Sequence, residues 1–392
     1  MRRVCKCCVS FICVICMMTV CACGYFGTTK QLTAKELQEK WDIDPSVKKV
    51  IVDADVHFLG DDVYALNTLV MADKLGYLDL CGVTACCGNT YVEGATYDAL
   101  AYLEYIGRQD IPVYMGSNDL LSGISSADEL RRMCGNLTYV GFYDCKEAYT
   151  DNYLEATDTG LSEWDKSEPT CKPMQQAAAD YIIEEIHNNP GEVTIVALGA
   201  LTNVAMALQK DPSIAEDAAG IIYMGGVFDV YAEEQQKLEF NFWCDPEATM
   251  LALGAGWKNQ VIVSHDAATT CLKGFDLYKM ALEHNHNPFS ELFIEECKSG
   301  CSNEEEIRKK IEGGLLYCWD PITAAYILSP KICTDIEPRY VYVETNKGPT
   351  YGLTLNWKEG LQPEGTYKAD VVLAVDRDKF WEFFFDISDA LS

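Results

Sequence analysis

The segment VDADVHFLGDDVYAL, residues 52–66, decides the fold, and it places four aspartates within ten positions. It follows a short apolar stretch typical of a strand and continues into a longer stretch typical of a helix. Asp53 and Asp55 are therefore predicted at the carboxyl end of a strand, and Asp61 and Asp62 at the start of the next helix. Open parallel sheets bind their ligands at this edge, so the segment predicts a site there.

Apolar β-rich stretches alternate with helical ones along most of the chain. Strands are predicted at 48–55, 78–87, 111–116, 191–199 and 219–226, and helices at 62–76, 92–107, 174–189 and 201–209. This alternation predicts βαβ units. We expect one α/β domain over residues 48–392, with a mostly parallel, Rossmann-like central sheet flanked by helices and a smaller helical C-terminal part.

The first residues have the pattern of an export signal. Residues 1–24 carry a basic start and an apolar run from Val9 that is too short to span a membrane comfortably. The run ends in VCACG, which resembles a bacterial lipobox with Cys23 as the lipidated residue; the alternative is a plain cleaved signal peptide. Both predict an exported protein, in which residues 25–47 act as a tether to the folded domain.

Charge and cysteine content limit the class of protein. The formal net charge of -29 argues against nucleic acid as a partner, because phosphate binding needs clustered lysine and arginine. A cation or a neutral small molecule fits better. Of the 19 cysteines, 12 lie beyond the leader, which is too few in a body of this size for a disulfide-stapled scaffold.

The crowded aspartates need an explanation of their own. A helix N-terminus offsets repulsion by about 0.3–1 kcal/mol per charge, which is too little for four carboxylates. Grouped carboxylates raise one another's pKa or recruit a cation, and a purely oxygen ligand set selects Ca²⁺ or Mg²⁺. Calcium suits irregular loop ligands better. The alternative is helix capping with solvated loop charge.

Five further segments, taken in order with the opening one, carry a resemblance to a known family. They are GVTACCGN (82–89), PGEVTIVALGALTNVAMAL (190–208), IIYMGG (221–226), LEFNFWCDPEA (238–248) and YCWDPITAAYILSP (317–330). Together they resemble the nucleoside hydrolases, the calcium-dependent N-ribohydrolases of the inosine-uridine preferring type. The resemblance extends over roughly residues 48 to 385.

The resemblance implies roles for particular residues. Asp55, Asp62, Asp320 and the main-chain carbonyl of Leu198 match the calcium ligands, and Asp55 also matches the general base that acts on a calcium-bound water. Trp319 stands where some relatives have a histidine that protonates the leaving base, and it is expected to stack on that base. Residues that match the ribose-binding positions are Asp61, Asn89, Met224, Glu239 and Asn241.

The chemistry gives independent reasons for these residue types. Cleavage of an N-glycosidic bond builds positive charge on the ribose, which nearby anionic and carbonyl oxygens stabilise. A hard cation can bind the vicinal hydroxyls and also lower the pKa of the attacking water. Two alternatives remain open for the leaving base: Trp319 could be ordinary core packing, and His265, beside Asp266, could be a general acid.

We therefore expect an exported, lipid-anchored hydrolase that splits ribonucleosides into ribose and free base, as in nucleoside salvage. One alternative is a non-catalytic surface protein that binds nucleosides, and another is a hydrolase of a different N-riboside. The expected cofactor is Ca²⁺. The only membrane contact expected is the lipid at Cys23, and relatives of this family suggest a homo-oligomer by analogy.

Overall fold

The computed structural model describes most of the chain. It covers residues 30–44, 49–57, 60–135, 139–145, 169–230, 238–314 and 317–391. The expected signal peptide and Cys23 lie outside these residues. Within them, no helix combines the length and the apolar character needed to cross a membrane.

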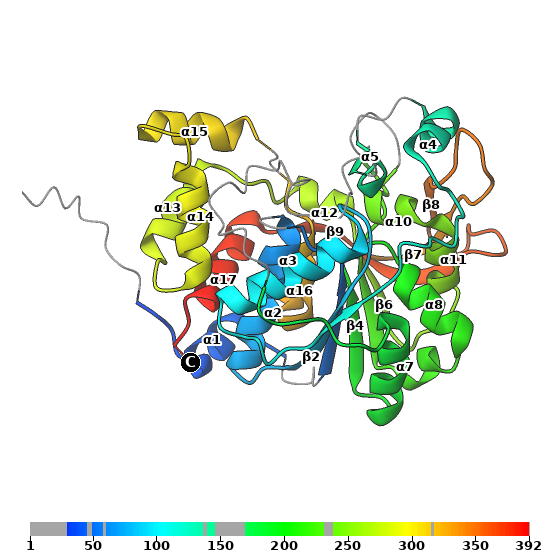
Figure 1. Cartoon of the computed structure of the whole chain (residues 1–392), viewed down its shortest axis with the longest axis horizontal. Helices are drawn as coiled ribbons and strands as arrows, with labels where there is room; N and C mark the ends of the chain where they lie inside the picture. Colours follow the sequence, from blue (N-terminus) through cyan, green and yellow to red (C-terminus); the bar gives the residue numbers. More distant parts are fainter. Residues whose placement is uncertain are drawn as a thin grey trace, which may run out of the picture.

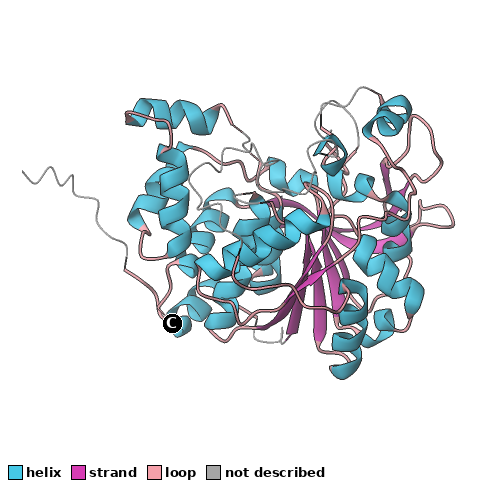
Figure 2. Ribbon diagram, in the orientation of Figure 1, coloured by secondary structure: helices cyan, strands magenta, loops and turns pink. Residues whose placement is uncertain are grey.

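A single nine-stranded sheet forms the centre of the molecule (Figure 2). Its strand order is β3-β2-β1-β4-β5-β6-β9-β7-β8. The strands from β3 to β9 in this order pair in parallel, whereas β7 pairs antiparallel with both β9 and β8. The bounds are β1 Lys49–Ala54, β2 Asp79–Ala85, β3 Val113–Met115, β4 Val193–Ala197, β5 Gly220–Met224, β6 Gln260–Val263, β7 Cys333–Val343, β8 Thr354–Trp357 and β9 Tyr367–Val375. The mostly parallel sheet confirms the expected fold class.

Helices cover both faces of the sheet (Figure 1). In β1, Val50 and Val52 belong to one buried cluster and Ile51 to another, because successive side chains of a strand point to opposite faces. The first cluster includes residues of α1 (Ala34–Trp41), α2 (Asp61–Lys74), α3 (Val92–Tyr105), α16 (Asp320–Leu328) and α17 (Arg377–Ser388). The second includes residues of α7 (Ala178–Asn188), α8 (Thr202–Lys210), α9 (Ile214–Asp217) and α11 (Pro246–Leu253).

Shorter helices complete the described structure. They are α4 (Ala127–Cys134), α5 (Phe142–Cys145), α10 (Phe240–Cys244), α12 (His265–Thr269), α13 (Phe275–Glu283), α14 (Pro288–Lys298), α15 (Glu304–Glu312) and the 3-10 helix η2 (Pro330–Ile332). Figure 1 places α13, α14 and α15 together at one side of the molecule.

The strand order creates a switch point beside β1. The chain moves outward from β1 to β2 and β3, and then returns to place β4 on the other side of β1. Connections from β1 and β4 therefore leave the sheet in opposite directions and open a crevice at their carboxyl ends. The aspartate-rich segment follows β1, and Leu198 follows β4.

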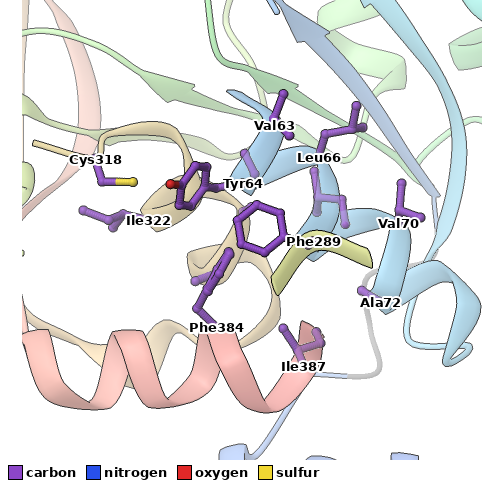
Figure 3. Packing of buried hydrophobic residues seen from close by; sticks show 14 of the residues in the cluster. Val63, Tyr64, Leu66, Val70, Ala72, Phe289, Cys318, Ile322, Phe384 and Ile387 are labelled. Carbon is purple, nitrogen blue, oxygen red and sulfur yellow. The ribbon is translucent and has the colours of Figure 1, made fainter. Parts of the chain in front are cut away.

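Helix α2 is held firmly, and its N-terminus carries the aspartates. Figure 3 shows Tyr64 of α2 packed among Phe289, Phe384 and residues of α16. The ring of Tyr64 lies edge-on to Phe289, with 4.8 Å between centroids, and 5.6 Å from that of Phe384. Because α2 and α16 share this buried contact, their N-terminal ends are fixed relative to each other.

The expectation of a tether over residues 25–47 is wrong for the part that the structure describes. Thr33 caps α1 through a capping box, and Leu37 and Trp41 are buried in the core. The indole Nε1 of Trp41 donates to Asp386 Oδ2 of α17 at 2.8 Å. An amphipathic helix of this kind gains stability by burying its apolar face, so the domain begins before residue 48.

The C-terminal part contains more than the expected helices. Strand β9 inserts beside β6 and extends the parallel sheet, and β7 and β8 form its antiparallel edge. The sequence pattern did not predict these strands, because β7 is charged and partly exposed along its first half. An antiparallel edge strand with one solvated face lacks the continuous apolar stretch of a central parallel strand.

We predict that α1 contributes to global stability. Replacing the fully buried Leu37 with alanine should lower the free energy of unfolding by about 2–4 kcal/mol, because the change leaves a cavity. Lys35→Ala on the exposed face of the same helix is the matched control and should change it by less than about 0.5 kcal/mol. Urea unfolding of both variants measures the difference, and equal values would show that α1 is not part of the folded core.

Candidate functional site

Three carboxylates from two helices meet at the carboxyl edge of the sheet. Asp61 and Asp62 begin α2, and Asp320 begins α16. One carboxylate oxygen of each lies within 4.8 Å of the other two, and within the described ranges this is the one acidic group with metal-binding spacing. Asp61 Oδ2 also accepts hydrogen bonds from the backbone amides of Trp319 and Asp320, at 2.8 and 3.1 Å. The N-terminus of α16 is therefore tied to that of α2.

This cluster is short of positive charge. Asp62 and Asp320 are buried, and burial together with the neighbouring carboxylates raises the pKa of both well above the usual range. Asp62 Oδ1 finds no hydrogen-bond partner among the residues that the structure describes. Buried carboxylates in this state either share protons or bind a cation. The oxygen-only set fits a hard divalent ion.

Asp55 lies beside this group in a tight backbone cradle. Its Oδ2 accepts the backbone amide of Asn89 at 2.6 Å. A Cβ atom added at Gly88 would lie 2.1 Å from Asp55 Oδ2, and one added at Gly199 would lie 2.5 Å from Oδ1. Burial raises the pKa of Asp55 to about 7, although the Asn89 amide opposes this effect; the charges of Asp61 and Glu239 add to it. The group is thus poised to exchange a proton near neutral pH.

Asn89 connects Asp55 to the acidic group. Its backbone amide binds Asp55, and its side-chain Nδ2 lies 3.5 Å from Asp62 Oδ2. The hydroxyl of Tyr139 donates to Asn89 Oδ1 at 2.9 Å, and the Tyr139 ring packs against Phe240. An exposed aromatic side chain therefore borders the site at a position that the sequence did not single out.

A second part of the site follows β4 and β5. Asn241 Nδ2 donates to the carbonyl of Leu198 at 2.8 Å and contacts the carbonyl and the sulfur of Met224 at 3.2 and 3.3 Å. The structure thus brings Leu198, Met224 and Asn241 together, as the resemblance implied. Because a carbonyl oxygen has two lone pairs, Leu198 can accept Asn241 and still offer a pair to another partner.

Glu239 has a structural role that the sequence did not predict. Its carboxylate accepts the backbone amides of Asn241, Phe242 and Gly226 at 2.9, 3.0 and 2.8 Å. It therefore caps α10 and ties that helix to the turn after β5. Burial raises the pKa of Glu239, and these amides act against that shift. Glutamate is not among the residues that commonly cap helices, so the sequence carried no signal of this role.

Trp319 and His265 are in direct contact. Trp319 is half-buried, and its indole Nε1 donates to His265 Nδ1 at 2.9 Å. His265 is itself buried, and burial lowers its pKa. Trp319 therefore lies on the rim of the acidic group rather than deep in the core.

Two of the four predicted calcium ligands meet in the acidic group. Asp62 and Asp320 meet as expected, but Asp61, which the resemblance assigned to the ribose, is the third member of the close group, and Asp55 is held to one side by Asn89. The reason is geometric: Asp61 and Asp62 share the first turn of α2, whereas Asp55 belongs to the end of β1.

Sequence reasoning missed the supports beneath Asp55. Asp53, the penultimate residue of β1, is fully buried and accepts hydrogen bonds from Thr84 and Asn203 at 2.6 and 2.8 Å. Gly88 and Gly199 leave room for the carboxylate of Asp55 itself. Gly88 directly follows a predicted strand and Gly199 ends one, and a close backbone approach is a common reason for glycine at such positions.

Comparison with known proteins agrees with this geometry. Residues 50–382 match the family model described as inosine-uridine preferring nucleoside hydrolase. The chain is 29% identical to uridine nucleosidase 1 of Arabidopsis thaliana, over 79% of this chain and 81% of that protein. It is 26% identical to the pyrimidine-specific ribonucleoside hydrolase RihA of Citrobacter koseri, over 79% of this chain and 90% of that protein.

A solved structure shares the architecture over the same length. The plant nucleoside hydrolase PpNRh1 superimposes with a TM-score of 0.69 at 26% identity, covering 88% of this chain and all of that one. The similarity therefore includes the sheet, the helices on both faces and the segments that carry the site.

We predict that, in the presence of a chelator, the free energy of unfolding depends on pH through Asp55. An unfolded aspartate ionises near pH 4, whereas folded Asp55 keeps its proton up to about pH 7. Between these values the unfolded state binds fewer protons, so the free energy of unfolding falls as pH rises, by about 1.4 kcal/mol per pH unit for this group.

Asp55→Asn cannot ionise and should lack this contribution. The stability of the wild type relative to the variant should therefore decrease between pH 5 and pH 7, as measured by urea unfolding in EDTA. Comparing the two proteins cancels the titration of the histidines. A difference that stays constant or grows with pH would contradict the raised pKa.

Proposed function

Because this chain belongs to the inosine-uridine preferring nucleoside hydrolase family and hydrolyses the N-glycosidic bond of ribonucleosides, we propose that its cofactor is calcium and that Asp55 is its general base. The observation that carries the proposal is the close group of Asp61, Asp62 and Asp320 beside the cradled carboxylate of Asp55.

The residues fit a calcium ion on chemical grounds. Asp55, Asp62, Asp320 and the carbonyl of Leu198 would hold it, and the orphaned Oδ1 of Asp62 needs a positive partner. Every donor is an oxygen on an irregular segment or a helix end, which suits the loose coordination of calcium. A bound calcium ion would supply the charge that acidifies a water molecule and orients the ribose hydroxyls.

Asp55 is suited to accept the proton of the attacking water. The Asn89 amide holds its Oδ2, and its pKa near 7 leaves it partly ionised at neutral pH. As the bond to the base breaks, positive charge develops on the ribose. The carboxylates of Asp55 and Asp61 and the carbonyl of Leu198 then stabilise the transition state, because they are fixed before the reaction begins.

The remaining residues orient the sugar and the base. Asp61, Asn89 and Asn241 offer hydrogen-bonding groups to the ribose, and Met224 packs against it. Glu239 contributes by holding α10 and Asn241 in place, in addition to any contact with a hydroxyl. Trp319 provides a flat surface on which the leaving base stacks.

We predict that Asp55→Asn lowers kcat at least about 100-fold on inosine and uridine, because general base catalysis contributes roughly 10²–10⁴. Released ribose measures turnover, in calcium and in EDTA. Asp79→Asn, at the opposite end of the sheet, is the matched control and should keep full activity. EDTA should abolish turnover and calcium should restore it.

Four outcomes would count against the proposal or redirect it. Unchanged turnover in Asp55→Asn would remove that residue as the base, and full activity after exhaustive chelation would remove the metal. Binding of nucleosides in calorimetry without any release of base would indicate a surface binding protein instead. Cleavage of neither inosine nor uridine, together with release of ribose from another N-riboside, would redirect the substrate assignment.

We also propose that the protein is exported and held at the membrane by a lipid on Cys23. The support is the basic and apolar pattern of residues 1–24 followed by VCACG. Cys23→Ser should move the protein from the membrane fraction to the soluble fraction in a bacterial host, with its nucleosidase activity intact. A membrane fraction that is unchanged in this variant would contradict the anchor. Size-exclusion chromatography of the soluble form would test the expected homo-oligomer.

A further inference from the structure

A buried histidine contacts the aromatic residue that borders the site. His265 is the first residue of α12, directly after β6, whereas Trp319 precedes α16. The indole Nε1 of Trp319 donates to His265 Nδ1 at 2.9 Å. The hydrogen bond therefore joins two segments that are far apart in the sequence.

The direction of this hydrogen bond follows from the chemistry of its partners. An indole N–H can only donate, so His265 Nδ1 must be the acceptor and cannot carry a proton. The neutral imidazole then has its proton on Nε2. Burial favours this uncharged form, because it lowers the pKa of His265.

His265 is itself fixed from several sides. Its backbone amide donates to the carbonyl of Gly226 at 2.9 Å, and Ser264 caps its helix. The carboxylate of the next residue, Asp266, accepts the backbone amides of Phe228, Asp229 and Val230, at 2.8, 2.7 and 3.0 Å. The backbone of His265 is thus attached to the turn that directly follows Met224 at the end of β5.

Three aromatic rings pack together next to the site. Tyr317 stacks on Trp319 with 5.5 Å between centroids and 26° between planes. The ring of His265 lies 5.4 Å from Tyr317 and 6.0 Å from Trp319, at 38° and 32°. Trp319 is therefore held by ring packing and by one directional hydrogen bond.

We propose that His265 is a positioning residue for Trp319: by accepting the indole N–H it fixes the ring against which the leaving base stacks. This inference rests on the proposed function, and it assigns to His265 a role other than that of a general acid. A mispositioned indole would weaken contact with the base in the transition state and leave the binding of ribose unchanged. Comparing ligands that contain a base with free ribose, which lacks one, therefore separates this role from a general structural one.

Variants that differ in their acceptor atom test the proposal. His265→Phe keeps a ring but has no acceptor, and His265→Asn offers an oxygen near the place of Nδ1. His265→Gln places its oxygen one bond farther along the side chain, near the position of Nε2. We expect kcat/KM for inosine and uridine to fall about 3- to 10-fold in His265→Phe and His265→Gln, the size of one hydrogen bond, and to be largely retained in His265→Asn. The inhibition constant of free ribose should not change in any of them.

A double-mutant cycle shows whether the effect passes through the indole. Trp319→Phe keeps an aromatic surface and removes the donor, so His265→Phe should add no further loss of kcat/KM in that background. Undiminished kcat/KM in His265→Phe, or an equal additional loss in the Trp319→Phe background, would overturn the proposal. So would a loss in His265→Asn as large as that in His265→Gln.

Failure of this inference can be told apart from failure of the proposed function. If wild-type protein releases no base from inosine or uridine, the proposed function fails for these substrates. If the wild type is active and the His265 variants do not follow the expected order, only the positioning role fails. Should His265→Phe not fold, the comparison of His265→Asn with His265→Gln still decides, because both keep a polar side chain at that position.

Discussion

The mutual repulsion of buried carboxylates at the carboxyl end of β1 is the constraint on which the rest of the structure depends. Asp55, Asp62 and Asp320 are withdrawn from water, which raises the pKa of all three, and the charges of neighbouring carboxylates add to this effect. A folded chain tolerates such a group only if backbone dipoles, protons or a cation compensate it. The site supplies backbone dipoles, and its oxygen atoms are arranged for a cation.

Backbone groups provide part of this compensation. The N-termini of α2 and α16 point into the acidic group, and Asp61 accepts two amides from the start of α16. The amide of Asn89 does the same for Asp55. These contacts need rigid support, which explains why α2 is packed so closely against α14, α16 and α17 around Tyr64 (Figure 3). Packing of α2 away from the site thus fixes the geometry within the site.

Much of this organisation could be predicted from the sequence. The period of apolar residues predicted strands β1 to β5. The resemblance carried by the short motifs implied that Asp62 and Asp320 would lie in one site, although they are far apart in the sequence. Asp61 accepts the backbone amide of Asp320 across a similar interval. The capping role of Glu239 and the contact between Trp319 and His265 were not predictable, because both depend on which segments the folded sheet brings together. Helix α1 was missed because a short polar segment near the chain start looks like a linker until Leu37 and Trp41 find a surface to cover.

The close approach of Gly88 and Gly199 to Asp55 divides the site into regions of unequal tolerance to mutation. One methyl group at either glycine would collide with the carboxylate, so variation there must displace Asp55. Tyr139, in contrast, has half of its surface exposed and could be exchanged without such a clash. A library intended to change which nucleobase is accepted should therefore randomise Tyr139 and leave the two glycines untouched.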